Sequence, residues 1–95
     1  MSMDQQTGIE TLIDEIEELA EDIEHHTILY NDEFHVFDDV VIWVKTATGK
    51  TIEEAYSITL EAHINGCAIC FSGDKSACER VADFLRGIGL IVEVD

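Results

Sequence analysis

The sequence predicts a small α+β domain in which helices pack on a short sheet. Apolar residues recur at three- and four-residue steps over several segments, which is the spacing of amphipathic helices. Three shorter runs rich in strand-forming residues lie between or after these segments. A chain of 95 residues, with 46% hydrophobic and 27% charged side chains, is long enough for one core and too short for two. We therefore expect one folded domain.

Residues 1–24 are predicted to form an acidic amphipathic helix ahead of a domain over residues 25–95. The segment carries nine acidic side chains and no basic one. Its apolar residues nevertheless keep helical spacing, at Ile9, Leu12, Ile13, Ile16, Leu19, Ala20 and Ile23. Such a stripe needs a partner, which is either the domain behind it or a second copy of the chain. The sequence leaves intramolecular packing and self-association open.

The order of elements after this helix is β-α-α-β-α-β. The predicted elements are a strand over residues 26–30, helices over 36–46 and 52–65, a strand over 67–72, a helix ending near 86 and a strand over 90–94. Gly49 is expected to take a left-handed cap, and Thr51 with Glu54 to form a capping box. A second capping box is expected at Ser76 and Glu79. This order gives a small sheet with helices packed on it.

Charge and composition exclude several classes of partner. The chain has 21 acidic and 5 basic residues, a formal net charge of -16, so nucleic acids and anionic membranes are not expected to bind. No signal peptide or membrane-spanning run is evident, and a cytoplasmic location is predicted. The odd number of cysteines (Cys67, Cys70 and Cys78) favours free thiols over a disulfide framework.

An acidic turn after the first strand is the strongest candidate for a binding site. Asn31, Asp32 and Glu33 follow the apolar run Ile28-Leu29-Tyr30, and a second apolar run begins at Phe37. Carboxylates at the rim of an apolar surface suit an amine that is attached to a hydrophobic group.

Catalysis is not expected from these residues. Asp32 and Glu33 with His63 have the residue types of an acid–base set, but a nucleophile elbow, a complete metal set and an oxyanion hole are all missing. Cys67 and Cys70 would point to opposite faces of a strand, which argues against a metal or redox pair. No enzyme activity, metal or cofactor is predicted. A satisfied structural role for His63 remains open.

The acidic turn and a later helix end together resemble the ClpS family of protease adaptors. The residues that carry the likeness are Leu29-Tyr30-Asn31-Asp32-Glu33, then Phe37, Val40, Val41 and Ala55, and then His63-Ile64-Asn65-Gly66-Cys67-Ala68. The likeness runs from about Thr27 to the end of the chain. It implies a three-stranded antiparallel sheet and a non-enzymatic adaptor of the N-end rule. Such adaptors bind proteins whose first residue is a bulky hydrophobe and deliver them to a Clp-type AAA+ unfoldase and its peptidase.

The resemblance also implies roles for individual residues. Asn31, Asp32 and His63 match family residues that hydrogen-bond the free α-amino group and the first peptide unit, and Glu33 stands where aspartate is common. The walls of the side-chain pocket correspond to His35, Phe37, Val40, Thr59, Ala62 and Leu90. Phe37 and Thr59 stand where methionine is common, and Ala62 replaces a larger aliphatic residue. We therefore expect aromatic first residues to bind better than leucine.

One departure from the family supports an alternative. Family members carry a flexible N-terminal extension that the unfoldase engages, whereas this chain is predicted to begin with an acidic helix. The alternative is an interaction or dimerisation module that keeps the ClpS fold without binding N-degrons.

Overall fold

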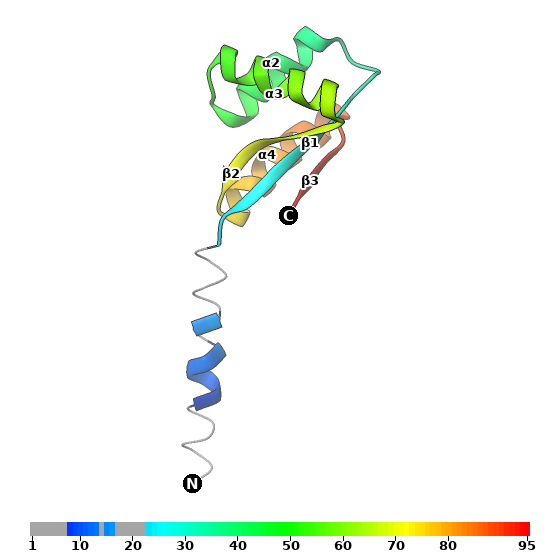
Figure 1. The fold of residues 1–95 in the computed structure, drawn as a ribbon. Coiled ribbons are helices and arrows are strands. Elements are labelled where there is room, and N and C mark those ends of the chain that lie inside the picture. The colour runs from blue at the N-terminus through cyan, green and yellow to red at the C-terminus, as the bar shows by residue number, and fades with distance from the viewer. Residues whose placement is uncertain (1–7, 14, 17–22) are drawn as a thin grey trace.

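A computed structural model describes residues 8–13, 15–16 and 23–95 of the chain (Figure 1). Its elements are β1 (His25–Tyr30), α2 (Phe37–Thr48), α3 (Ile52–Asn65), β2 (Cys67–Gly73), α4 (Lys75–Ile88) and β3 (Val92–Val94). The predicted α+β class and the β-α-α-β-α-β order are confirmed. None of the helices in the described ranges is long and apolar enough to cross a membrane.

The sheet has three antiparallel strands in the order β2-β1-β3. Strand β1 therefore lies in the centre, and the loop that follows it leaves from the middle of the sheet. The pairing of β1 with β2 shifts register between Thr27 and Ile28. In Figure 1, α4 lies against one face of the sheet, while α2 and α3 pack together beyond the end at which β1 stops. The loop from β1 to α2 is thus close to both helices.

One apolar core joins the sheet to all three helices. Leu29 of β1, Val44 of α2, Ala55 of α3 and Leu85 of α4 are each no more than 1% exposed. Burying an aliphatic side chain of this size contributes about 1.5–3 kcal/mol. On α2, the valines Val40, Val41 and Val44 are buried together at helical spacing.

Each of the helices α2, α3 and α4 ends at a glycine with positive φ, namely Gly49, Gly66 and Gly89. Gly49 has φ 73° after α2, as predicted, and Thr51 caps α3 by accepting a hydrogen bond from the Glu54 amide at 3.1 Å. The glycine that ends α4 is Gly89, at φ 108°. Gly87 lies within the helix, so α4 is longer than predicted and β3 begins at Val92 instead of Leu90.

The second capping box was predicted at the wrong place. The N-cap of α4 is Asp74, whose carboxylate accepts a hydrogen bond from the Ala77 amide at 2.7 Å. Ser76 lies inside the helix, where its hydroxyl accepts a hydrogen bond from Arg80. Aspartate is as good an N-cap as serine, and Asp74 begins the helix two residues before the predicted cap.

The N-terminal segment is helical over residues 8–13 and 15–16. The four apolar residues of this part (Ile9, Leu12, Ile13 and Ile16) are 48–59% exposed, so their stripe is not covered by the core. Ile23 and Glu24 are not helical, which corrects the predicted helix end at residue 24. The rest of that predicted helix lies outside the described residues.

Candidate amine-binding pocket

The loop after β1 is tied to the end of α3 through main-chain hydrogen bonds. The Asn31 amide donates to the Gly66 carbonyl at 2.9 Å, and the Tyr30 amide donates to the Ile91 carbonyl at 3.0 Å. Gly66 is the left-handed cap of α3, with φ 92°, and His63 occupies the last turn of that helix. These bonds bring Asn31 and His63 to the same site although they are distant in the sequence.

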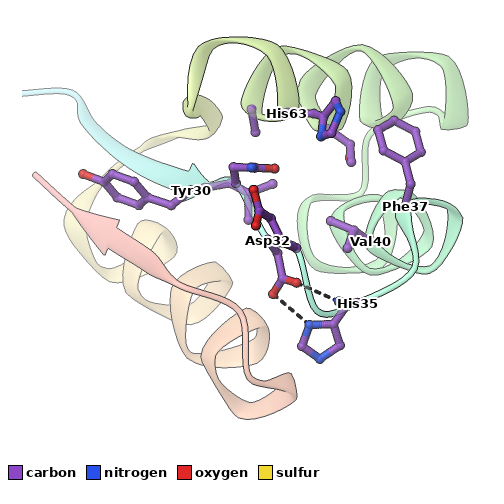
Figure 2. A pocket seen from close by; sticks show the side chains of 11 residues that line it. Tyr30, Asp32, His35, Phe37, Val40 and His63 are labelled. Atoms are coloured by element: carbon purple, nitrogen blue, oxygen red, sulfur yellow. Dashed lines mark hydrogen bonds and ion pairs between the residues drawn. The ribbon is translucent and has the colours of Figure 1, made fainter.

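The Asp32 carboxylate organises the loop. Its Oδ1 accepts hydrogen bonds from the amides of Phe34 and His35, both at 2.7 Å, and its Oδ2 accepts one from Nδ1 of His35, also at 2.7 Å (Figure 2). The side chain is only 7% exposed. Burial alone would raise the pKa of Asp32, but the hydrogen bonds from His35 and Phe34 outweigh it and hold that pKa below the usual range. Asp32 is therefore held ionised, and its charge fixes the turn.

His35 connects this turn to two helices. Its ring lies edge-on to Trp43 of α2, with centroids 5.3 Å apart. On another side it lies against Gly89, where an added Cβ would stand 3.6 Å from the imidazole Cε1. Figure 2 shows the ring on the far side of Asp32 from Phe37 and His63. His35 thus supports the loop more than it forms the apolar wall predicted for it.

Aromatic rings form the opposite side of the site. Phe37, the first residue of α2, contacts Tyr56 and His63 of α3 edge-on, with centroids 5.5 and 6.3 Å apart. The contact with Tyr56 restricts the position of the Phe37 ring. In Figure 2, Phe37 and His63 face the loop that carries Asp32.

Loop and helices enclose a pocket of about 430 Å³, which we call the amine pocket. It is lined by Leu29, Tyr30, Asn31, Asp32, Glu33, His35, Phe37, Val40, Thr59, Ala62 and His63. The volume is in the range of small-ligand sites. Its floor is apolar, since Val40, Thr59 and Ala62 are buried, and the Thr59 hydroxyl donates to the Ala55 carbonyl of its own helix at 2.8 Å.

All the predicted site residues except Leu90 line this pocket. Leu90 is 4% exposed and belongs to the core, and its amide donates to the Leu85 carbonyl at 3.1 Å. The left-handed turn at Gly89 precedes Leu90, and the structure places Leu90 in the core instead of in the lining of the pocket. Sequence reasoning missed Leu29 and Tyr30 as lining residues. Their position directly before the acidic turn was the available signal.

The rim offers hydrogen-bond acceptors that nothing else in the described chain uses. The side chains of Asn31, Glu33 and His63 have no hydrogen-bond partner among the described residues. No lysine or arginine lines the pocket. The described residues also contain no cluster of three or more histidine, cysteine or acidic side chains arranged for a metal ion. The arrangement can therefore receive a cation at the rim and an apolar group on the floor.

The comparison with protein families bears on this site directly. The model of the ATP-dependent Clp protease adaptor protein ClpS matches residues 9–88, which include the whole pocket. The chain belongs to the ClpS family. This result also confirms the resemblance read from the acidic turn and the end of α3.

Two relatives illustrate the match. The chloroplastic ATP-dependent Clp protease adapter protein CLPS1 of Arabidopsis thaliana is 36% identical over 72 residues, or 75% of this chain. The chain spans 45% of that relative's length. The structure of Agrobacterium tumefaciens ClpS2 bound to L-phenylalaninamide superimposes with a TM-score of 0.65 at 15% identity, and the match covers 76% of this chain and 94% of that one. This similarity concerns the fold.

Proposed function

We propose that this chain is a non-enzymatic adaptor that binds the free α-amino group and the bulky first side chain of N-degron proteins. The observation that carries this proposal is the amine pocket, in which unused acceptors at the rim stand over an apolar floor. A protonated amine has three donors and requires acceptors, and a large side chain requires an apolar cavity. The relative from Agrobacterium tumefaciens is bound to L-phenylalaninamide, which carries both features.

The acceptors have different roles in this proposal. A carboxylate has about four acceptor positions, and the structure uses two on Oδ1 and one on Oδ2 of Asp32. Asp32 therefore orients the loop and keeps one position for the amine. Glu33, whose carboxylate is exposed and unbonded, supplies the main counter-charge. Asn31 and His63 bind the remaining amine protons or the first peptide unit.

The floor favours an aromatic first residue. Ala62 and Thr59 leave room where larger side chains would fill it, and the Thr59 hydroxyl already has its acceptor. Phe37 offers a ring edge or face that is restricted by Tyr56. Aromatic pairs contribute about 0.5–1.5 kcal/mol beyond buried area, which an aliphatic leucine lacks. We infer the order phenylalanine, tyrosine or tryptophan over leucine.

Neither half of the ligand suffices alone. Burial of one large side chain contributes about 1.5–3 kcal/mol, and each charge-assisted hydrogen bond adds about 1.5–3 kcal/mol before the cost of association. Loss of either half therefore leaves too little free energy for stable binding.

The test is fluorescence anisotropy with labelled peptides that differ in their first residue, each with a free or an acetylated amine. We expect binding of the Phe, Tyr, Trp and Leu peptides with free amines, no binding of the Ala peptide, and loss of all binding on acetylation. Tighter binding of the Leu peptide than of all three aromatic peptides would refute the predicted preference. Binding that ignores acetylation would refute the proposal itself.

Delivery is the second half of the proposed role. The family description names an ATP-dependent Clp protease, and the partner that we expect is a Clp-family AAA+ unfoldase with its peptidase. A fluorescent reporter with an N-terminal phenylalanine should be degraded faster by such a protease when this chain is added, and a reporter with an N-terminal alanine should not. The predicted cytoplasmic location is tested by fractionation of the source cells.

A further inference from the structure

A second hollow, which we call the α4 groove, lies between the end of α2, strand β2 and α4. It measures about 300 Å³ and includes Phe71, Val81 and Phe84 as its larger apolar side chains, together with Arg80. Phe84 is 43% exposed, which leaves part of its ring open to solvent. The groove shares no lining residue with the amine pocket.

Arg80 lines this groove and, among the described residues, has no carboxylate partner. Only Arg86 among the lysines and arginines pairs with carboxylates of the described residues, with Glu79 and Asp83 at 3.7 Å. Arg80 instead donates to the Ser76 hydroxyl at 3.0 Å. Lys45 and Lys75 are exposed; Lys45 directly precedes the groove residue Thr46, and Lys75 lies two residues before the groove residue Ala77. The chain has 21 acidic residues, yet these three cations have no carboxylate partner in the part of the chain that the structure describes.

The N-terminal helix has the complementary properties. Its stripe of Ile9, Leu12, Ile13 and Ile16 is half exposed, and residues 1–24 carry nine acidic and no basic side chains. The stripe spans seven helical steps, or about 10.5 Å. The groove residues of α4, from Ala77 to Phe84, span the same number of steps. An acidic helix with an apolar stripe thus matches, in length, an apolar groove that contains Arg80 and is flanked in the sequence by Lys45 and Lys75.

The chain enters the domain beside this groove. His25, the first residue of β1, pairs with Gly73, and a Cβ on Gly73 would stand 3.9 Å from Cβ of Ala77. Figure 1 shows the start of β1 next to the turn from β2 to α4. Residues 17–24 separate the apolar stripe from β1, and eight residues span up to about 26 Å. The connection is long enough for the helix to reach the groove of its own domain.

We propose that the α4 groove binds the N-terminal helix of the same chain through the stripe of residues 9–16. The stripe would cover Phe71 and Phe84, and the acidic side chains beside it would pair with Arg80, Lys45 and Lys75. The amine pocket stays open in this docked form, since the two sites share no residue. Peptide binding and helix docking can therefore succeed or fail separately.

Paramagnetic relaxation of the full chain tests this proposal. A nitroxide is attached at Gly8→Cys in a Cys67→Ser background, where the remaining cysteines are buried. In dilute solution the amide signals of Phe71, Ala77 and Phe84 should lose most of their intensity, while the signal of His63 should keep it. If the signals of Phe71, Ala77 and Phe84 all kept their intensity, the proposal would be overturned.

Two charge reversals and a mixing experiment complete the test. Arg80→Glu should restore the groove signals, whereas the matched control Lys50→Glu, which reverses an unpaired lysine outside the groove, should leave them broadened. Equal behaviour of the two variants would refute the role of Arg80. Mixing nitroxide chains with isotope-labelled chains that lack the nitroxide should leave the labelled chains unbroadened. If the labelled chains were broadened as much as chains that carry both the nitroxide and the isotope label, the groove would bind the helix of a second copy and the proposal would be overturned.

Discussion

Replacing Asp32 by asparagine tests the role of this carboxylate as the organiser of the binding loop. The variant keeps the size of the side chain but removes its charge and turns one acceptor toward His35 into a donor. Hydrogen bonds to charged acceptors contribute about 1.5–3 kcal/mol and neutral ones about 0.5–1.5 kcal/mol. Weakening the two main-chain bonds by about 1–1.5 kcal/mol each lowers the free energy of unfolding by at least about 2–3 kcal/mol, and losing the bond to the ring adds to this. In a domain of this size, the main-chain part alone should lower the melting temperature by about 8–24 °C.

The matched control is Glu33→Gln, which removes the same charge from the next residue. The Glu33 carboxylate has no hydrogen-bond partner among the described residues, so the free energy of unfolding should change by less than about 0.5 kcal/mol. Its affinity for a free N-terminal phenylalanine should fall roughly tenfold, because a charge-assisted hydrogen bond becomes a neutral one. Thermal unfolding followed by circular dichroism, with peptide anisotropy on the same samples, measures both quantities. Equal melting temperatures for the two variants would refute the reasoning.

The stability difference between the wild type and Asp32→Asn should also depend on pH, with a defined sign. The pKa of Asp32 in the folded chain lies below its usual 3.8, so ionised Asp32 stabilises the fold above that value. This contribution is lost as the pH falls through the folded pKa. The stability difference between wild type and Asp32→Asn should therefore be constant from neutral pH to about pH 4 and shrink below it. A difference that grows on acidification would contradict the assignment.

Three further predictions concern the floor of the pocket, a helix cap and the thiols. Ala62→Leu should fill the pocket floor and weaken binding of a Trp-initiated peptide by about tenfold or more, with a smaller loss for a Leu-initiated one; equal losses would contradict the assigned floor. Thr51→Ala should cost about 1 kcal/mol of unfolding free energy in a urea titration and leave peptide affinity unchanged, because it removes only the cap of α3. A thiol reagent should modify Cys67 in the folded protein and spare Cys70, since Cys70 is 0% exposed and burial raises its pKa to about 12; rapid reaction of Cys70 in native protein would show that the core opens.

The features of the fold that local periodicity records could be predicted. The stripe of Val40, Val41 and Val44 and the cap at Thr51 follow from side-chain spacing and from one favoured hydrogen bond. The start of α4 was predicted two residues late, at Ser76 instead of Asp74, because aspartate and serine are comparable N-caps. The length of β3 depended on the path of the chain after Gly89, which periodicity does not describe.

In the candidate site, too, some residues could be placed from local sequence patterns and others could not. Residues that follow a strand or lie on one face of a helix, such as Asn31, Phe37 and Ala62, line the pocket as predicted. Leu90 does not, because the left-handed turn before it determines which way its side chain points. The bond between Asp32 and His35 was also not predicted, since the direction of a side chain in an irregular loop is set by contacts with Trp43 and Gly89 that only the folded chain brings together.

The most direct test of the central claim is a titration of the isotope-labelled chain with L-phenylalaninamide and with its N-acetyl derivative, followed by amide chemical shifts. We predict saturable shifts at Asn31, Glu33 and His63 with the free amine, none with the acetylated compound, and no change at Arg80 or Phe84 of the α4 groove. Identical shifts with both compounds, or shifts confined to the groove, would contradict the assignment of the amine pocket as the site that reads a free N-terminus.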